Sequence, residues 1–121
     1  MKILDKEFEV DFFDADFMER YEKEAESAKK ELNNINISTM KQSEAINTVC
    51  EIIERCFDNI WGQGTSKEIF KEKRNFRLCI KAFQDLKKGK KEQEKELFSE
   101  IRSLQQEIQD IPYEYSTERI K

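Results

Sequence analysis

The stretch FDNIWGQGTSKEIF (residues 57–70) contains the feature that decides the fold. The 121-residue chain has only three glycines, and Gly62 and Gly64 stand here one residue apart. Gly62 follows the last apolar turn of a predicted helix, where helices commonly end on a left-handed glycine. Thr65 and Glu68 have the T-x-x-E spacing of a capping box, which opens a helix. The stretch therefore predicts a structural joint that ends one helix and starts the next.

A phosphate-binding loop is the alternative interpretation of the two glycines. Such a loop has the pattern G-x-x-x-x-G-K-[ST], whose backbone N–H groups surround the phosphates. Here the second glycine comes two residues after the first and precedes Thr-Ser-Lys. We therefore favour the joint over a nucleotide site, and we expect no bound cofactor.

The composition favours a mostly α protein. Charged residues make up 40% of the chain, and there is one proline. Abundant Lys, Glu and Gln with little Gly or Pro is typical of helices. Nine Phe, three Tyr and one Trp argue against disorder. We expect one helical domain over residues 1–111, with a loose tail over 112–121.

The N-terminus predicts a small β-hairpin over residues 1–13. EFEVDF (residues 7–12) alternates between charged and apolar residues, which indicates a half-buried strand. The apolar side chains on its inner face are Phe8, Val10 and Phe12. Residues 3–4 would form the partner strand across a tight turn at 5–6. The outer strand edge would stay open to a second subunit.

Two helices follow the hairpin and form an antiparallel pair. The first is expected over about 14–33, with Asp16 and Glu19 as its capping box. Its apolar seam steps by three and four residues through Met18, Tyr21, Ala25, Ala28, Leu32 and Ile35. The second helix begins near Ser38 or Thr39 and runs to the glycine joint. A short link of this kind is typical of an αα-hairpin.

The C-terminal half predicts a short helix over 66–72 and then a long helical tract from about 75. Gly89 leaves open whether that tract is interrupted. A second apolar seam steps by four and three: Leu97, Ile101, Leu104, Ile108 and Ile111. Two heptads are too few for an autonomous coiled coil, and Pro112 ends the tract.

Charge is unevenly distributed along the chain. Residues 1–31 carry 11 acidic and 6 basic side chains, whereas residues 62–95 carry 5 acidic and 11 basic ones. This asymmetry favours electrostatic contacts within one chain or between copies, and we expect a homo-oligomer. Solvated helix faces are the alternative. The candidate interaction residues are Phe8, Val10, Phe12, Lys71, Lys81 and Lys87.

The sequence lacks the usual signs of catalysis and of a metal site. It has no histidine, which removes the commonest general base, and we expect a non-enzymatic protein with no catalytic or metal-binding residues. The three cysteines, Cys50, Cys56 and Cys79, are odd in number and widely spaced. That is typical of reduced cysteines buried in the core. An acidic pI near 5.1 disfavours nucleic-acid binding. No signal-peptide core or membrane-length apolar run is present, so we expect no membrane contact.

Three segments carry a resemblance to a family of small proteins in phages and prophages of low-GC Gram-positive bacteria. They are DFFDADFMERYE (11–22), WGQGTSKEIF (61–70) and NFRLCIKAF (75–83). The resemblance covers about residues 7–86. The chain departs from the family pattern at Trp61, where the family has Phe, and at Glu72 and Lys73, where it has glycines.

This family is similar to tail assembly chaperones of long-tailed phages, which sheathe the tape-measure protein and recruit tail tube subunits. The resemblance implies a non-enzymatic phage assembly protein in the host cytoplasm. Such a protein would self-associate and bind a helical partner such as the tape-measure protein or another tail protein. The alternative is a phage-encoded inhibitor that binds a host defence protein.

Overall fold

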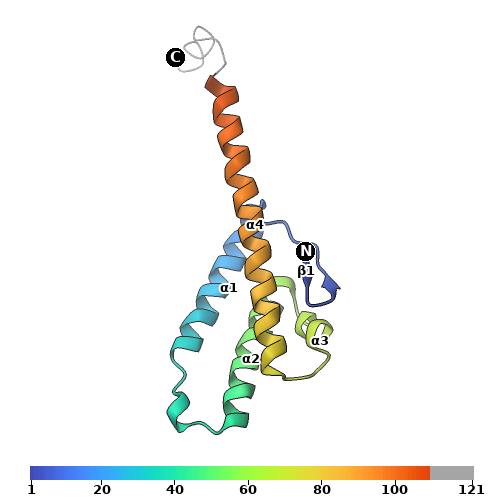
Figure 1. Ribbon diagram of the computed structural model, residues 1–121, viewed down its shortest axis with the longest axis vertical. Coiled ribbons are helices and arrows are strands. Elements are labelled where there is room, and N and C mark those ends of the chain that lie inside the picture. The colour runs from blue at the N-terminus through green and yellow to red at the C-terminus, as the bar shows by residue number, and fades with distance from the viewer. Residues whose placement is uncertain (110–121) are drawn as a thin grey trace.

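The computed structural model describes residues 1–109 and is mostly α-helical (Figure 1). The elements in chain order are β1 (Lys2–Ile3), β2 (Lys6–Glu7), α1 (Ala15–Asn33), the 3₁₀ helix η1 (Ile37–Thr39), α2 (Gln42–Trp61), α3 (Thr65–Phe70) and α4 (Phe76–Gln109). The predicted fold is confirmed: a helical hairpin, a short helix, a long C-terminal helix and a small N-terminal β-hairpin. The end of the predicted domain at Ile111, Pro112 and the predicted tail 112–121 lie outside the described residues.

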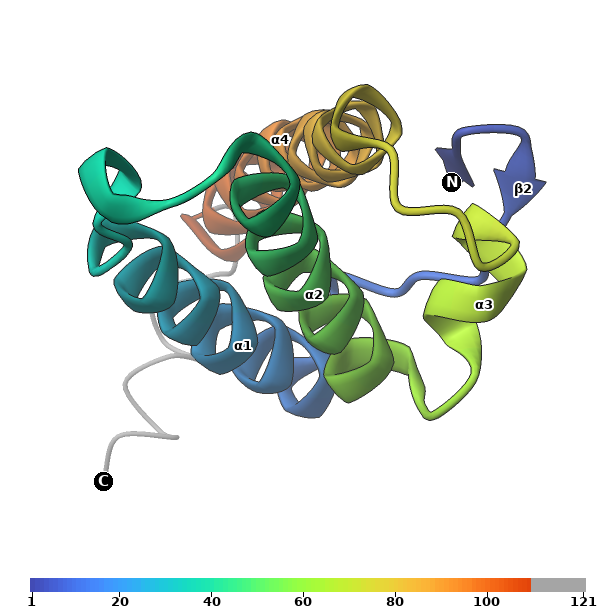
Figure 2. The ribbon, with the colours of Figure 1, turned by 90° about the horizontal axis from the view of Figure 1, so that it is seen from below.

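Helix α2 is the centre of the body. Its buried residues are Cys50, Ile52, Ile53, Cys56, Phe57 and Ile60, and Figure 2 shows α2 in the middle of the other helices. Helix α1 packs antiparallel to it, and Arg55 of α2 donates to the Glu31 carboxylate of α1 at 2.7 Å. Burial of this broad apolar face is the main stabilising term of the body.

Helix α4 packs on the other side of α2 through Cys79, Ala82 and Leu86, all at most 1% exposed. The helix continues without a break through Gly89. A Cβ atom at Gly89 would collide with the Met1 side chain, so this glycine allows the N-terminus to approach the helix closely. The question that the sequence left open is thus answered by packing: Gly89 makes room for a neighbour and does not end the helix.

The N-terminal strands are shorter than predicted. β1 and β2 pair antiparallel, with Lys2 opposite Glu7 and Ile3 opposite Lys6. The turn therefore lies at residues 4–5, where Leu4 has a φ of 54°. Of the strand predicted over residues 7–12, only Glu7 lies in β2, and residues 8–12 are not a strand. Their alternation is explained by packing on the helices, since Phe12 is 5% exposed within the core.

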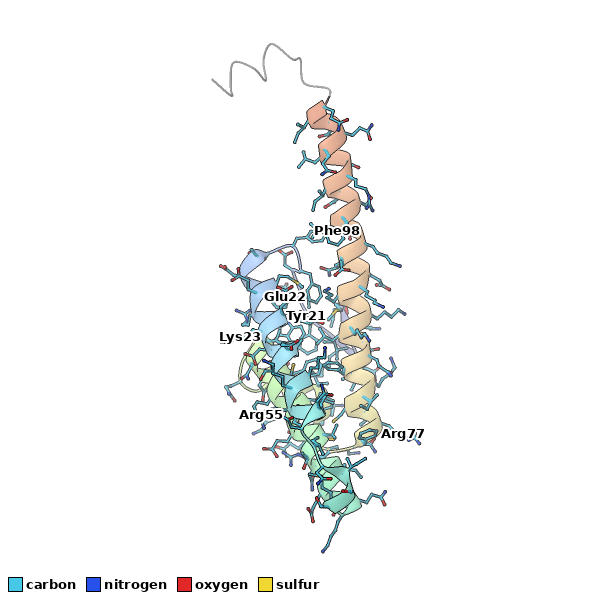
Figure 3. The ribbon with its side chains drawn as sticks, turned by 90° about the vertical axis from the view of Figure 1, so that its left-hand side faces the viewer. Tyr21, Glu22, Lys23, Arg55, Arg77 and Phe98 are labelled. Atoms are coloured by element: carbon cyan, nitrogen blue, oxygen red, sulfur yellow. The ribbon has the colours of Figure 1, made fainter. Side chains whose placement is uncertain are left out.

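The C-terminal part of α4 extends beyond the other helices (Figure 1). We call residues 97–109 the arm and residues 1–96 the body. Figure 3 shows Phe98 at the level where α4 leaves the body. Every residue of the arm after Leu97 is exposed.

Candidate interaction surfaces

The predicted joint is present, but its backbone differs from the prediction. Gly62 ends α2 with φ 124° and ψ 161°, a conformation open to glycine only, and not the left-handed one that was predicted. Gly64 is the left-handed residue, with φ 95° and ψ −11°, and it caps α3. The predicted capping box of Thr65 and Glu68 is wrong, because the Thr65 hydroxyl donates to the Gly62 carbonyl at 2.7 Å.

Asp58 fixes the joint, and the sequence analysis missed it. Its carboxylate accepts from the backbone N–H of Ser66 at 2.8 Å and from the Ser66 hydroxyl at 3.0 Å. Asp58 therefore caps α3 from the preceding helix. One signal was available: an acidic side chain in the last turn of a helix is unfavourable with the helix dipole, so its presence there indicates a partner elsewhere. The joint is a structural device.

The cap of α1 also differs from the prediction. Asp14 accepts from the Phe17 N–H at 2.9 Å and is the N-cap residue. Asp16 lies inside the first turn, where its charge favours the helix dipole. The predicted capping box of Asp16 and Glu19 is therefore wrong: the N-cap lies two residues earlier, and the residue three positions after it is Phe17.

The predicted apolar interaction residues face the protein's own helices. Phe8 lies 5.5 Å from the Trp61 ring, between centroids. Phe12 contacts Tyr21 edge-on at 5.3 Å. Val10 is half-buried against the core. The strand edge expected at these residues is absent from the structure, so the two aromatic side chains stabilise the body.

The structure does not gather the three predicted lysines into one patch. Lys71 is the left-handed residue that ends α3. Lys81 forms an ion pair with Asp85, on the side of α4 that carries the hairpin. Lys87 lies on the side of α4 that faces α1. Of the three, Lys87 alone lines the groove described below.

All three cysteines are buried and unbridged, as the sequence predicts for core residues. Burial, with the nearby Glu24 and Glu31 carboxylates, raises the pKa of Cys56 to about 11. Burial and a hydrogen bond with Cys50 also raise the pKa of Cys79. These two thiols stay protonated at neutral pH, which makes them poor nucleophiles.

An open groove of about 620 Å³ separates α1 from α4. Figure 3 shows Tyr21 on the side of α1 that faces α4. The residues that line the groove are Tyr21, Glu22, Ala25, Glu26, Lys29, Leu32, Asn33, Phe83, Lys87, Lys90 and Lys91. Its apolar residues on α1 belong to the apolar seam that the sequence predicted for this helix. Only Ala28 of that seam is fully buried. Tyr21 and Leu32 pack against the core but are only partly buried, so part of each side chain stays exposed in the groove.

The arm carries the second uncovered apolar surface. Its stripe is Phe98, Ile101, Leu104 and Ile108, which are 49%, 40%, 53% and 55% exposed. Single exposed apolar residues are common on protein surfaces, but a continuous row marks an interaction site. A helix of this length and pattern is marginal on its own in water.

The groove and the stripe lie on one face of α4. The residues Phe83, Lys87, Lys90, Glu94, Leu97, Ile101, Leu104 and Ile108 step alternately by four and three. That spacing keeps side chains on one side of a helix. A smaller pocket with Leu97, Phe98 and Met18 among its lining residues connects the two surfaces. One partner helix could therefore contact both.

The described residues contain no cluster of three or more His, Cys, Asp or Glu side chains able to hold a metal ion. Across residues 1–109, the helices are too short or too polar to cross a membrane.

Residues 4–119 of the chain match a protein family. The chain belongs to DUF6673, a family of unknown function. Comparisons with curated proteins and with solved structures give no match. The match covers nearly the whole chain, so the groove and the whole arm lie within the family region.

Proposed function

We propose that this DUF6673 protein is a non-enzymatic phage assembly factor, similar to tail assembly chaperones, that self-associates and binds a helical segment of a partner such as the tape-measure protein. It would act in the host cytoplasm. The observation that carries the proposal is the apolar stripe of the arm, which no residue between 1 and 109 covers. The sequence resemblance supplies the phage context.

A helical partner fits the surfaces better than an extended peptide does. The groove is bounded by two helices, α1 and α4, and the stripe has helical spacing. An amphipathic helix recognises such a groove through apolar residues at i, i+3, i+4 and i+7. The tape-measure protein, the partner that the resemblance implies, would supply such a helix.

The test is a nonsense mutation of the gene in a phage that encodes this chain. Filled heads without tails, seen by electron microscopy and restored by the wild-type gene supplied in trans, are expected. A mutant that assembles normal tails and plates normally would overturn the assembly role.

The same mutant distinguishes the assembly role from the alternative function, inhibition of a host defence protein. A mutant with normal tails that fails only on hosts carrying a defence system would favour the inhibitor that the sequence left as its second interpretation.

A further inference from the structure

We propose that two copies form an antiparallel two-fold dimer in which the arm of each copy lies in the α1–α4 groove of the other. This inference rests on the proposed function, since it names one contact of the self-association. It accounts for both uncovered surfaces with a single symmetric interface, in which each contact occurs twice. A partner helix would therefore compete with the second copy for the groove and the stripe.

The arm and the groove have matching lengths. The arm has 13 residues, which span about 20 Å at 1.5 Å per residue. The groove extends along α1 from Tyr21 to Asn33, which is about 18 Å at the same rise. The arm of a second copy would thus add a further helix beside α1 and α4.

The spacing of the seam sets the register. A two-fold axis between Lys95 and Glu96 places Ile108 of one copy opposite Phe83 of the other. In the same register, Leu104 faces Lys87 and Ile101 faces Lys90. The aliphatic stems of the two lysines can cover the apolar stripe while their ammonium groups reach water.

The charges of the two surfaces are complementary. The groove is lined by four lysines and two glutamates. The arm carries two glutamates and one arginine. The excess charge is therefore positive in the groove and negative on the arm, which favours this docking and makes it sensitive to salt.

A parallel dimer is disfavoured by the same residues. In parallel helix pairs each seam position faces its own copy. Lys87 would then face Lys87, and Lys90 would face Lys90, so like charges would meet. The antiparallel register removes both repulsions.

The first experiment measures association of the full chain by sedimentation equilibrium at several concentrations and salt concentrations. We expect a monomer–dimer equilibrium that weakens as salt rises. A strict monomer at high concentration and low salt would overturn the dimer; an arm covered by residues 110–121 of its own chain would give that result.

Matched variants test the two halves of the contact. Leu104→Glu places a charge within the stripe, and Gln106→Glu places the same charge on the opposite face of the arm. Both residues are exposed, and Glu is a good helix former. Leu104→Glu should raise the dissociation constant by on the order of 100-fold, since the charge is buried twice per dimer, whereas Gln106→Glu should not.

On the groove side, Ala25→Arg fills the groove, and Ser27→Arg adds the same side chain to the exposed face of α1. Ala25→Arg should disrupt the dimer, and Ser27→Arg should leave it intact. Equal effects within either pair, with helicity unchanged by circular dichroism, would overturn the proposed contact.

Spin labels at Gln105→Cys determine the direction of the helices. The antiparallel register separates the two labels by roughly 30 Å along α4, because each lies about ten residues from the axis. A separation of roughly 15 Å would indicate a parallel pair and overturn the proposal. Failure of these tests leaves the tail-assembly role standing, because that role is decided by the phage mutant.

Discussion

The two halves of α4 have the same apolar spacing but different surroundings. In the body, Cys79, Ala82 and Leu86 step by three and four and are at most 1% exposed. In the arm, Ile101, Leu104 and Ile108 step by three and four and are at least 40% exposed. The difference is that α2 covers the first row. A periodic pattern thus predicts the apolar face of a helix but not which molecule covers it.

The largest expected effect contrasts a body residue with an arm residue. Phe57 is fully buried and stacks on Trp61 at 5.7 Å. Phe57→Ala should cost about 3–5 kcal/mol of unfolding free energy, because a cavity remains. Leu104→Ala should cost about 0.5 kcal/mol or less in dilute protein, as for other surface positions. Urea unfolding at low protein concentration measures both values.

Repeating the unfolding measurements at higher protein concentration provides a control for the Leu104→Ala result. If the arm binds a second copy, the wild type gains stability as concentration rises, and Leu104→Ala loses that gain. A large cost of Leu104→Ala in dilute solution would mean that the arm is covered within its own chain.

An intermediate effect is expected at the joint. Asp58→Ala removes the acceptor for both the N–H and the hydroxyl of Ser66, a residue that is 8% exposed. Leaving a buried donor unpaired costs about 1–3 kcal/mol, and Asp58→Asn should recover part of that loss. Thermal unfolding of the two variants gives the comparison. Equal stability of Asp58→Ala and wild type would show that Gly62 and Gly64 form the joint without a cap.

Local features made most of the fold predictable. Helix α1 was expected over 14–33 and spans Ala15–Asn33. This prediction succeeded because the apolar spacing of the helix and the residues that end it are close together in the sequence. The strand predicted over 7–12 was wrong beyond Glu7, because alternation only shows that every second side chain is buried. It does not distinguish a strand ladder from an extended segment that packs on helices.

The candidate surfaces were less predictable, because they depend on what the fold leaves uncovered. Tyr21, Ala25 and Leu32 have the spacing of core residues, yet they line the groove. Asp58 and Ser66 are eight residues apart, and their contact depends on the turn between them. The sequence could not decide whether Gly89 interrupts the long helix, because the residue that packs against it, Met1, lies far away in the sequence.

The smallest expected effect is at the contact of the hairpin with the body part of α4. The Asp85 carboxylate accepts from the backbone N–H of Leu4 at 2.9 Å and pairs with Lys81. Burial raises the pKa of Asp85, but the hydrogen bonds from Lys81 and Leu4 and the charge of Lys81 lower it by more, so the pKa lies below its usual range. A carboxyl group with a lowered folded pKa stabilises the protein above its unfolded pKa of about 3.9. That stability is lost as pH falls through the folded value.

Asp85→Asn should therefore lower the free energy of unfolding by about 1 kcal/mol at pH 7. This is the value for a hydrogen bond to a charged group, reduced because the carboxylate is partly exposed to solvent. The cost should shrink as pH falls below about 4, where Asp85 becomes protonated in the unfolded chain, and should shrink further as pH falls through the lowered pKa of the folded protein. Urea unfolding of both proteins at pH 7 and pH 3 measures this difference. A cost that is the same at both pH values would mean that the charge of Asp85 contributes nothing and that shape alone seats the hairpin. The arm has no such tether within residues 1–109, so this variant should leave dimerisation unchanged while it loosens the edge of the body.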